Sequence, residues 1–127
     1  MMIVENMKTI LVVDDEKCVR DVIKEFLEIF GYKVMVTSNG EKGIKYFNSN
    51  CVDLVITDIR MPIMDGYKFA RAIRNSDSAD TPIIAITGYF IKTNKENDLF
   101  NSIVDKPFNL NFLGKIVSEN LKPIKNQ

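Results

Sequence analysis

The chain has 127 residues, of which 46% are hydrophobic and 27% are charged. This composition is typical of one soluble globular domain and too apolar for a disordered protein. Lysine plus arginine equals aspartate plus glutamate at 17 each, so no overall basic field favours binding to nucleic acid or an anionic membrane surface. The sequence shows no signal peptide and no run of transmembrane length, and we therefore expect a cytoplasmic protein without membrane insertion.

The sequence offers few types of side chain that can bind a metal ion or act as a nucleophile. The sequence contains no histidine, which excludes Ser-His and Cys-His nucleophile pairs and histidine-ligated zinc. Cys18 and Cys51 form no CxxC pattern, and we predict two reduced, partly buried thiols rather than a disulfide or metal ligands. Chemistry in this chain must therefore rest on carboxylates, lysine, hydroxyl groups and a hard metal ion.

Short apolar runs rich in branched residues alternate along the chain with stretches of helical period. The predicted strands are Thr9–Val13, Lys33–Thr37, Val52–Thr57, Pro82–Thr87 and, more weakly, Ile103–Val104. Because the first four runs are almost continuously apolar, we expect these strands to be buried on both faces of a sheet.

Helical periodicity fills most of the segments between these strands. Apolar residues from Val19 to Phe30 predict a helix that ends at Gly31, and a capping box of Ser38 and Glu41 predicts the start of a second. The remaining apolar helix positions are Phe69, Ala72 and Ile73 after Gly66, and Leu110, Leu113, Ile116, Val117 and Leu121. The polar segment Lys92–Phe100 predicts only a marginal helix.

Five strands that alternate with five helical segments indicate an α/β fold of the (βα)5 type. Strand–helix–strand units cross over right-handed, which gives a doubly wound, five-stranded parallel sheet with helices on both faces. We expect one domain over residues 1–127, with a core at about 8–121 and a short polar tail at 122–127. Functional groups of such sheets gather beyond the carboxyl ends of the strands.

Residues suited to chemistry lie at the ends of four of the predicted strands. In chain order they are Asp14, Asp15 and Glu16, then Asp58, then Thr87 and Gly88, then Lys106 and Pro107. Each set alone has an ordinary explanation, since Asp15 would also serve as a helix N-cap and threonine favours strands. The coincidence of all four at one edge of the sheet indicates a site.

Clustered carboxylates repel one another and resist ionisation unless a cation lies among them. With oxygen ligands only, the expected cation is Mg2+. A carboxylate beside Mg2+ can attack phosphorus, while a lysine ammonium and a threonine hydroxyl bind phosphoryl oxygens. The residues therefore indicate phosphoryl chemistry.

Four stretches of the sequence resemble the response-regulator receiver family of two-component signalling, which includes the chemotaxis receivers. They are ILVVDDE at Ile10–Glu16, DLVITDIRMPIMDG at Asp53–Gly66, IAITG at Ile84–Gly88 and DKPF at Asp105–Phe108. The resemblance covers nearly the whole chain and implies the flavodoxin-like strand order 2-1-3-4-5.

The resemblance also implies roles for the site residues. Asp58 is expected as the phosphoacceptor, and Asp15, Asp58 and the backbone carbonyl of Arg60 as ligands of Mg2+, for which Mn2+ would substitute. Asp14 would act on the metal indirectly, through water or charge. The expected groups for phosphoryl binding and switching are Thr87, Gly88 and Lys106, with a cis peptide bond before Pro107.

The implied activity is a regulatory switch rather than an enzyme. The phosphoryl donor would be a histidine kinase or a histidine phosphotransfer protein, and the downstream target is not specified by the sequence. We expect a monomer or weak dimer. The sequence carries no DNA-binding or catalytic output region; the start at Met1 and the short tail favour a stand-alone receiver over a piece of a larger protein.

One position departs from the family pattern and keeps two alternatives open. Ile103 stands where relatives carry an aromatic residue that follows the threonine switch, although Tyr89 and Phe90 offer either a substitute gate or plain packing. One alternative is a receiver-like interaction module with impaired switching. The other is an aspartate-nucleophile phosphohydrolase, which normally has a second acid where this chain has Arg60. The Arg60 side chain is expected either to pair with Glu16 or to crowd incoming water.

Overall fold

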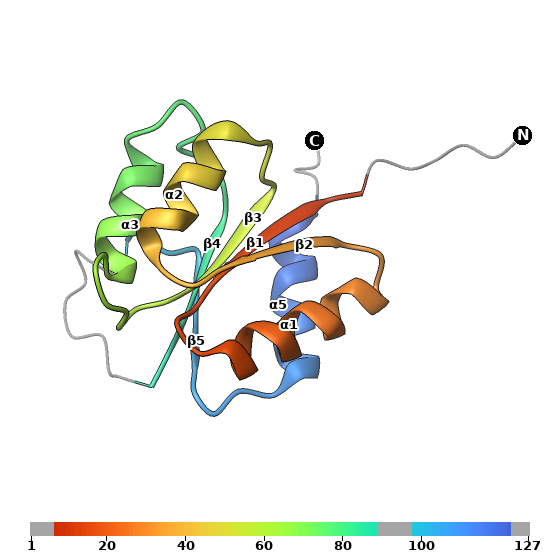
Figure 1. Cartoon of the computed structure of the whole chain (residues 1–127). Helices are drawn as coiled ribbons and strands as arrows, with labels where there is room; N and C mark the ends of the chain where they lie inside the picture. The colour runs from red at the N-terminus through yellow and green to blue at the C-terminus, as the bar shows by residue number, and fades with distance from the viewer. Residues whose placement is uncertain (1–6, 89–97, 123–127) are drawn as a thin grey trace, which may run out of the picture.

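A computed structural model describes residues 7–88 and 98–122. Its elements, in chain order, are β1 (Thr9–Val13), α1 (Lys17–Ile29), β2 (Lys33–Thr37), α2 (Gly40–Ser49), β3 (Leu54–Asp58), α3 (Gly66–Arg74), β4 (Ile83–Thr87), β5 (Ser102–Asp105) and α5 (Leu110–Leu121). Helices α2 and α3 cover one face of the sheet, and α1 and α5 cover the other (Figure 1). The helix expected within Lys92–Phe100 lies mostly outside the described residues.

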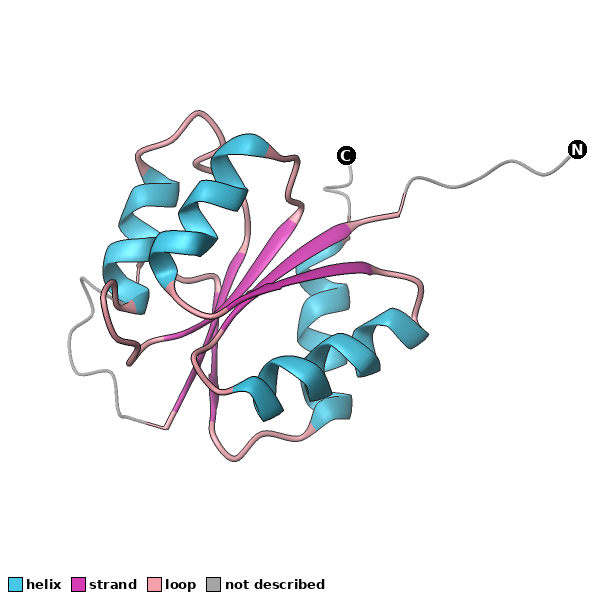
Figure 2. Ribbon diagram, viewed as in Figure 1, coloured by secondary structure: helices cyan, strands magenta, loops and turns pink. Residues whose placement is uncertain are grey.

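The sheet confirms the predicted parallel topology. Its strands lie in the order β2-β1-β3-β4-β5, and every neighbouring pair is parallel. Asp58 at the end of β3 is in register with Ile86, and Thr87 at the end of β4 with Asp105. The carboxyl ends of the strands therefore meet at one edge of the sheet, where Figure 2 shows the connecting loops in pink.

Successive strand residues point to opposite faces, so the sheet separates two apolar cores. Leu11 and Val55 face α2 and α3, whereas Ile10 and Leu54 face α1 and α5. All four side chains are fully buried. The continuous apolar runs in the sequence therefore correspond, as predicted, to strands covered on both sides.

Two local predictions need correction. The start of α2 uses no Ser38–Glu41 capping box, because Asn39 is the N-cap and its side chain accepts a hydrogen bond from the Lys42 backbone N–H at 2.9 Å. Asparagine caps helices at least as well as serine. Cys18 and Cys51 are both free as predicted, but they are exposed rather than partly buried. Cys18 is the second residue of α1, and Cys51 follows the C-cap of α2.

The N-terminus of α1 also differs from the simplest expectation. Its N-cap is Glu16 rather than Asp15, and the Glu16 side chain makes no capping hydrogen bond. Instead, the Asp14 carboxylate accepts a hydrogen bond from the Glu16 backbone N–H at 2.8 Å. This arrangement leaves the Asp15 carboxylate free of a capping role.

Candidate functional site

The residues predicted to form a site lie together at the carboxyl edge of the sheet. Asp14 follows β1, Asp58 ends β3, Thr87 ends β4 and Lys106 follows β5. Asp14, Asp58 and Thr87 are buried, with 2%, 7% and 1% of their surfaces exposed. Parallel topology thus brings into contact side chains that are up to 92 positions apart, as between Asp14 and Lys106.

The Lys106 ammonium lies at the centre of this cluster. Its Nζ atom is 3.0 Å from Asp58 Oδ2, 3.2 Å from Asp14 Oδ2 and 3.4 Å from Glu16 Oε1. The Lys106 backbone N–H donates to the Thr87 carbonyl at 2.8 Å, which ties β5 to the end of β4. The Lys106–Pro107 peptide bond is cis.

Burial and charge shift two pKa values in the cluster. Burial of the Asp14 carboxyl raises its pKa, and the negative charge of Asp58 adds to this effect. Burial by itself lowers the pKa of Lys106, but hydrogen bonds and charge from Asp58 and Asp14 outweigh that effect and raise the pKa to about 12. The lysine is therefore fully protonated at neutral pH, while the carboxylates around it carry an excess of negative charge.

The carboxylates suit a hard metal ion. Asp14, Asp15, Glu16 and Asp58 each offer an oxygen within 4.8 Å of the others. An all-oxygen donor set matches Mg2+, which commonly binds through one or two carboxylates and retains water. The expected ligands Asp15 and Asp58 belong to this group. Glu16, to which the sequence argument gave no ligand role, belongs to it as well; the acidic run that it shares with Asp14 and Asp15 is the signal for its inclusion.

The backbone after β3 fixes the orientation of the Asp58 carboxylate. Asp58 Oδ1 accepts a hydrogen bond from the Ile59 backbone N–H at 2.7 Å. The chain then returns so closely that a Cβ atom on Gly66 would lie 2.3 Å from the Asp58 carbonyl oxygen, and only glycine fits there. Asp65 caps α3 by accepting a hydrogen bond from the Lys68 backbone N–H at 2.9 Å.

The loop between Asp58 and Gly66 contains a strained turn. Ile63 has a φ of +75°, and the Met64 backbone N–H donates to the Pro62 carbonyl at 2.8 Å around it. Together these features define a classic γ-turn, a rare conformation. Such strain is typical of loops whose shape is fixed by a nearby functional site.

The Asp58 carboxylate lies at the base of an opening of about 340 Å³. The opening is lined by Asp15, Glu16, Asp58, Arg60, Gly88 and Lys106. Arg60 is exposed, so its side chain stands at the mouth while its backbone follows Asp58 by two residues. The site thus combines an oriented carboxylate, a fixed ammonium, nearby acidic oxygens and access for a small group.

Ile103, the residue that departs from the family pattern, lies in β5 beside this site. Ile103 is in register with Ala85 of β4, and 39% of its surface is exposed. No aromatic side chain occupies this strand position. Tyr89 and Phe90, the alternative gate, lie outside the described residues.

Comparisons with known proteins agree with this geometry. The model of the response regulator receiver domain matches residues 10–118. The chain belongs to the response regulator receiver family. It is 33% identical over 113 residues to the autoinducer 1 sensor kinase/phosphatase LuxN of Vibrio harveyi, covering 86% of the chain and 13% of that relative. It is 42% identical over 84 residues to a probable transcriptional regulator, ycf27, of Pyropia yezoensis, covering 65% of the chain and 34% of that relative.

Solved receiver structures have the same fold. The response regulator TrrA of Thermotoga maritima, in complex with Mg2+ and BeF, is 39% identical, with a TM-score of 0.84 over 91% of this receiver and 100% of TrrA. The receiver domain of a Pseudomonas aeruginosa sensor histidine kinase, with magnesium in its active-site cleft, is 29% identical, with a TM-score of 0.82 over 91% of this receiver and 98% of that domain. Within the described parts of this receiver, no helix has the length and apolar character needed to cross a membrane.

Proposed function

We propose that this receiver is a phosphorylation switch in which Asp58 accepts a phosphoryl group from a phosphohistidine. The observation that carries the proposal is how the Asp58 side chain is held. Only 8% of its surface is exposed. One oxygen is held by the Ile59 N–H and the other by Lys106. A carboxylate held in this way at the base of an opening is oriented for attack on an incoming phosphorus atom.

The transfer forms one bond and breaks one. An Asp58 carboxylate oxygen forms a P–O bond as the P–N bond of the donor breaks, and the electron pair of that bond remains on the imidazole nitrogen, which takes a proton from solvent. Lys106 moves from carboxylate oxygens to the phosphoryl oxygens, whose charge it balances. Thr87 ends β4 and Gly88 follows it. The Thr87 hydroxyl and the Gly88 backbone N–H would bind the same phosphoryl oxygens.

The residues that would hold Mg2+ are Asp15, Asp58 and the Arg60 carbonyl, with Asp14 acting through water. When bound, Mg2+ supplies positive charge that offsets the charge on the transferring phosphoryl group. Mn2+, which also prefers oxygen ligands, is expected to substitute. The excess of carboxylates over the single ammonium of Lys106 supports this assignment, because it leaves negative charge for a cation to balance.

The donor must supply the histidine, because this chain has none. A histidine kinase or a histidine phosphotransfer protein fits this requirement, and relatives named as sensor kinase/phosphatases support it. The phosphorylated receiver would shift its conformational equilibrium toward a form that binds a downstream partner. The domain then acts as a regulatory switch rather than as an enzyme with its own substrate.

Intact mass spectrometry tests the proposal. The protein is incubated with Mg2+ and acetyl phosphate, and we expect a gain of one phosphoryl group. The gain should be absent without Mg2+ and in Asp58→Asn, but present in Asp105→Asn, a matched control at the end of β5 whose carboxylate is outside the acidic group.

Two outcomes would contradict the switch. Steady consumption of acetyl phosphate, together with steady hydrolysis of a phosphate monoester, would indicate a hydrolase. No adduct, no consumption and no beryllofluoride binding would indicate an interaction module that has lost phosphoryl chemistry. Rapid autodephosphorylation differs from the first outcome because phosphate monoesters are not hydrolysed, and from the second because the beryllofluoride complex forms.

A further inference from the structure

Ile63, in the loop between β3 and α3, combines an unfavourable backbone conformation with an exposed side chain. Within residues 7–88 and 98–122 it is the only residue other than glycine with a positive φ, at +75°. For a β-branched residue such a φ is a genuine outlier and costs folding free energy. The side chain is 73% exposed, so its burial offsets little of that cost. The strain at Ile63 is therefore imposed by the rest of the loop.

The loop from Asp58 to Gly66 is held closed at its ends. The Gly66 backbone N–H donates to the Ile59 carbonyl at 2.8 Å. Ile59 and Met61 are buried in the apolar core on the α2–α3 face of the sheet. Because these contacts fix both ends, the chain must reverse within a few residues, and Ile63 takes the positive φ of that turn.

Ile59 joins the closure of the loop to the phosphoryl site. Its N–H donates to Asp58 Oδ1 at 2.7 Å, and its carbonyl accepts from Gly66. A hydrogen bond to a carboxylate is roughly twice as strong as one to a neutral oxygen. A phosphoryl group on Asp58 turns the carboxylate into an acyl phosphate, whose carboxyl oxygens carry no full charge. The bond from Ile59 then weakens, and the strain at Ile63 favours relaxation of the loop.

The loop also contacts the start of α2. A Cβ atom on Gly40 would lie 2.9 Å from the Met64 carbonyl oxygen and 3.0 Å from Met64 Cγ, so the two segments approach this closely because residue 40 is glycine. Gly40 is buried and is the first residue of α2, directly after the N-cap Asn39. Met64 follows the strained residue in the chain. A change in the Ile63 backbone therefore displaces the residue that packs against the N-terminus of α2.

We propose that the strained Asp58–Gly66 loop is a movable element that transmits phosphorylation of Asp58 to the N-terminus of α2. The inference rests on the proposed function, because its trigger is the loss of charge on the Asp58 carboxylate. Strain at Ile63 brings the closed and relaxed arrangements of the loop closer in free energy, so the weakening of one hydrogen bond shifts their populations. The surface that responds is the first turn of α2.

Hydrogen exchange of backbone amides, measured by mass spectrometry on the full chain, tests the inference. The protein is compared in Mg2+ alone and in Mg2+ with beryllofluoride, which occupies an Asp58 oxygen as the phosphoryl group does. The Ile59 and Gly66 amides should exchange about fivefold faster with beryllofluoride, because the loop opens more often. The Asp53 amide, which donates to the Thr9 carbonyl at the other end of the strands, should not change.

Transmission to α2 has its own readout in the same experiment. The Lys42 N–H donates to the Asn39 side chain at 2.9 Å, and the Gly43 N–H donates to the Asn39 carbonyl at 3.0 Å. Both amides should also exchange faster when beryllofluoride is bound, because displacement of Met64 disturbs the capped first turn.

Two substitutions at Ile63 separate strain from side-chain size. Ile63→Asn relieves the strain, because asparagine accepts a positive φ more readily than a β-branched residue does. Without beryllofluoride, the Gly66 amide of this variant should exchange at least about threefold more slowly than in the wild type, and beryllofluoride should accelerate it less. Ile63→Val keeps the branched Cβ and is the matched control, which should respond as the wild type does.

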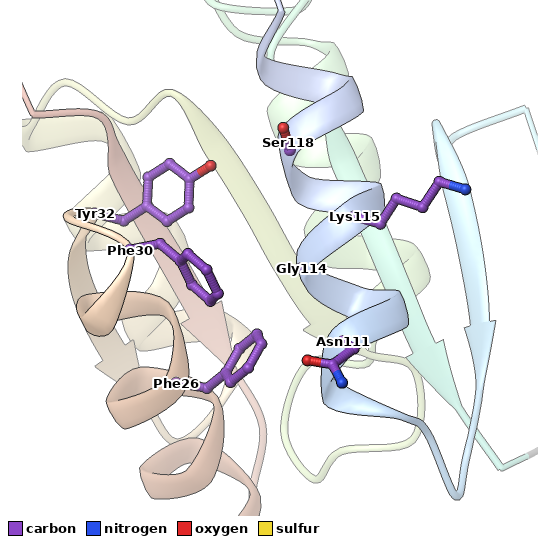
Figure 3. A pocket seen from close by; sticks show the side chains of 7 residues that line it. All are labelled: Phe26, Phe30, Tyr32, Asn111, Gly114, Lys115 and Ser118. Atoms are coloured by element: carbon purple, nitrogen blue, oxygen red, sulfur yellow. The ribbon is translucent and has the colours of Figure 1, made fainter.

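A substitution at Gly40 tests the contact from the side of the helix. Gly40→Ala places a Cβ atom against Met64, so the loop amides should exchange faster before beryllofluoride is added and respond less when it binds. Gly114→Ala is the control: Gly114 lies on α5 opposite Phe26 of α1 (Figure 3), and its Cβ atom would be similarly crowded, 3.0 Å from the Phe26 ring. Its loop amides should exchange as in the wild type.

Three results would overturn this inference while leaving the proposed function intact. They are a beryllofluoride complex with unchanged exchange in the loop, a loop that responds while the Lys42 and Gly43 amides do not, and equal responses in Ile63→Asn and Ile63→Val. Failure of the proposed function is recognised separately, by the absence of both the phosphoryl adduct and the beryllofluoride complex, and it would overturn this inference as well.

Discussion

Two cationic side chains, Lys106 and Arg74, are each held by several oxygen atoms. They lie at opposite ends of the strands of the same sheet. At the carboxyl edge, Lys106 contacts the carboxylates of Asp14, Glu16 and Asp58. At the other edge, the Arg74 guanidinium at the end of α3 donates to neutral acceptors instead. These acceptors are the carbonyls of Ala79, Thr81 and Leu99 and the side-chain oxygen of Asn101.

The difference separates a structural polar cluster from a functional one. The guanidinium of Arg74 satisfies several neutral acceptors at once, which joins the end of α3 to the segments before β4 and β5. Its single positive charge is offset by the nearby negative charge of Asp80. Around Lys106 four carboxylates outnumber the one ammonium, so the cluster suits a further cation. A buried polar group with unbalanced charge therefore points to binding, whereas a balanced one points to stability.

The largest effect on stability is expected from the balanced cluster. Arg74→Met removes every hydrogen bond of the guanidinium and leaves the Leu99, Ala79 and Thr81 carbonyls without this donor. We expect the free energy of unfolding to fall by about 3 kcal/mol, measured by urea denaturation. Lys45→Met on the exposed surface of α2 is the control. Phosphorylation of Asp58 in the folded protein should be unchanged; a stable variant that fails to accept the phosphoryl group would contradict the comparison.

A smaller loss that metal restores is expected from the unbalanced cluster. Lys106→Met leaves the Asp14 and Asp58 carboxylates without their cation, and we expect a loss of about 2 kcal/mol in the absence of Mg2+. Added Mg2+ should then raise the melting temperature of this variant more than that of the wild type, because the metal ion replaces the missing charge. Lys68→Met, at an exposed position on α3, should match the wild type. Equal Mg2+ shifts in Lys106→Met and the wild type would argue against an unbalanced site.

The sequence predicts the cluster around Lys106 but not the cluster around Arg74. Apolar runs fixed β1 and β2 to the residue, and parallel topology placed Asp14, Asp58, Thr87 and Lys106 at one edge. These inferences depend on continuous apolar runs and on the residues at strand ends, both of which are local features of the sequence. The Arg74 cluster escaped prediction because its acceptors are backbone carbonyls, which every residue has and no motif marks.

The same limit explains the other misses. Asn39 and Ser38 are adjacent and both favour helix N-caps, so only the backbone angles decide between them. Phe30 follows the apolar period of α1, but it lies at the helix C-cap, beyond the covered part of the helix, and is exposed. Pattern indicates which face of a helix is apolar; it does not indicate how far a neighbouring helix covers that face.

A gain of stability is expected when the charge excess is reduced. Burial and the Asp58 charge raise the pKa of Asp14 above its ordinary value of 3.8, so the folded state binds this proton more tightly than the unfolded state. Stability therefore declines as the pH rises from 3.8 through the raised pKa. Asp14→Asn should gain about 1 kcal/mol at neutral pH without Mg2+ and nothing at pH values below both pKa values. Urea denaturation at the two pH values measures this; an equal gain at both would contradict it.

The smallest effect is expected at the mouth of the site, where Arg60 is exposed beside the opening above Asp58. If its side chain narrows the path of water to the phosphorylated carboxylate, Arg60→Ala should speed autodephosphorylation by about threefold, which is less than 1 kcal/mol in the barrier. Arg60→Met keeps most of the bulk without the charge and should stay close to the wild-type rate. The decline of the phosphorylated mass after removal of acetyl phosphate gives both rates. An unchanged rate in Arg60→Ala would exclude crowding, and equal acceleration in both variants would show that the charge of Arg60, rather than its size, protects the phosphoryl group.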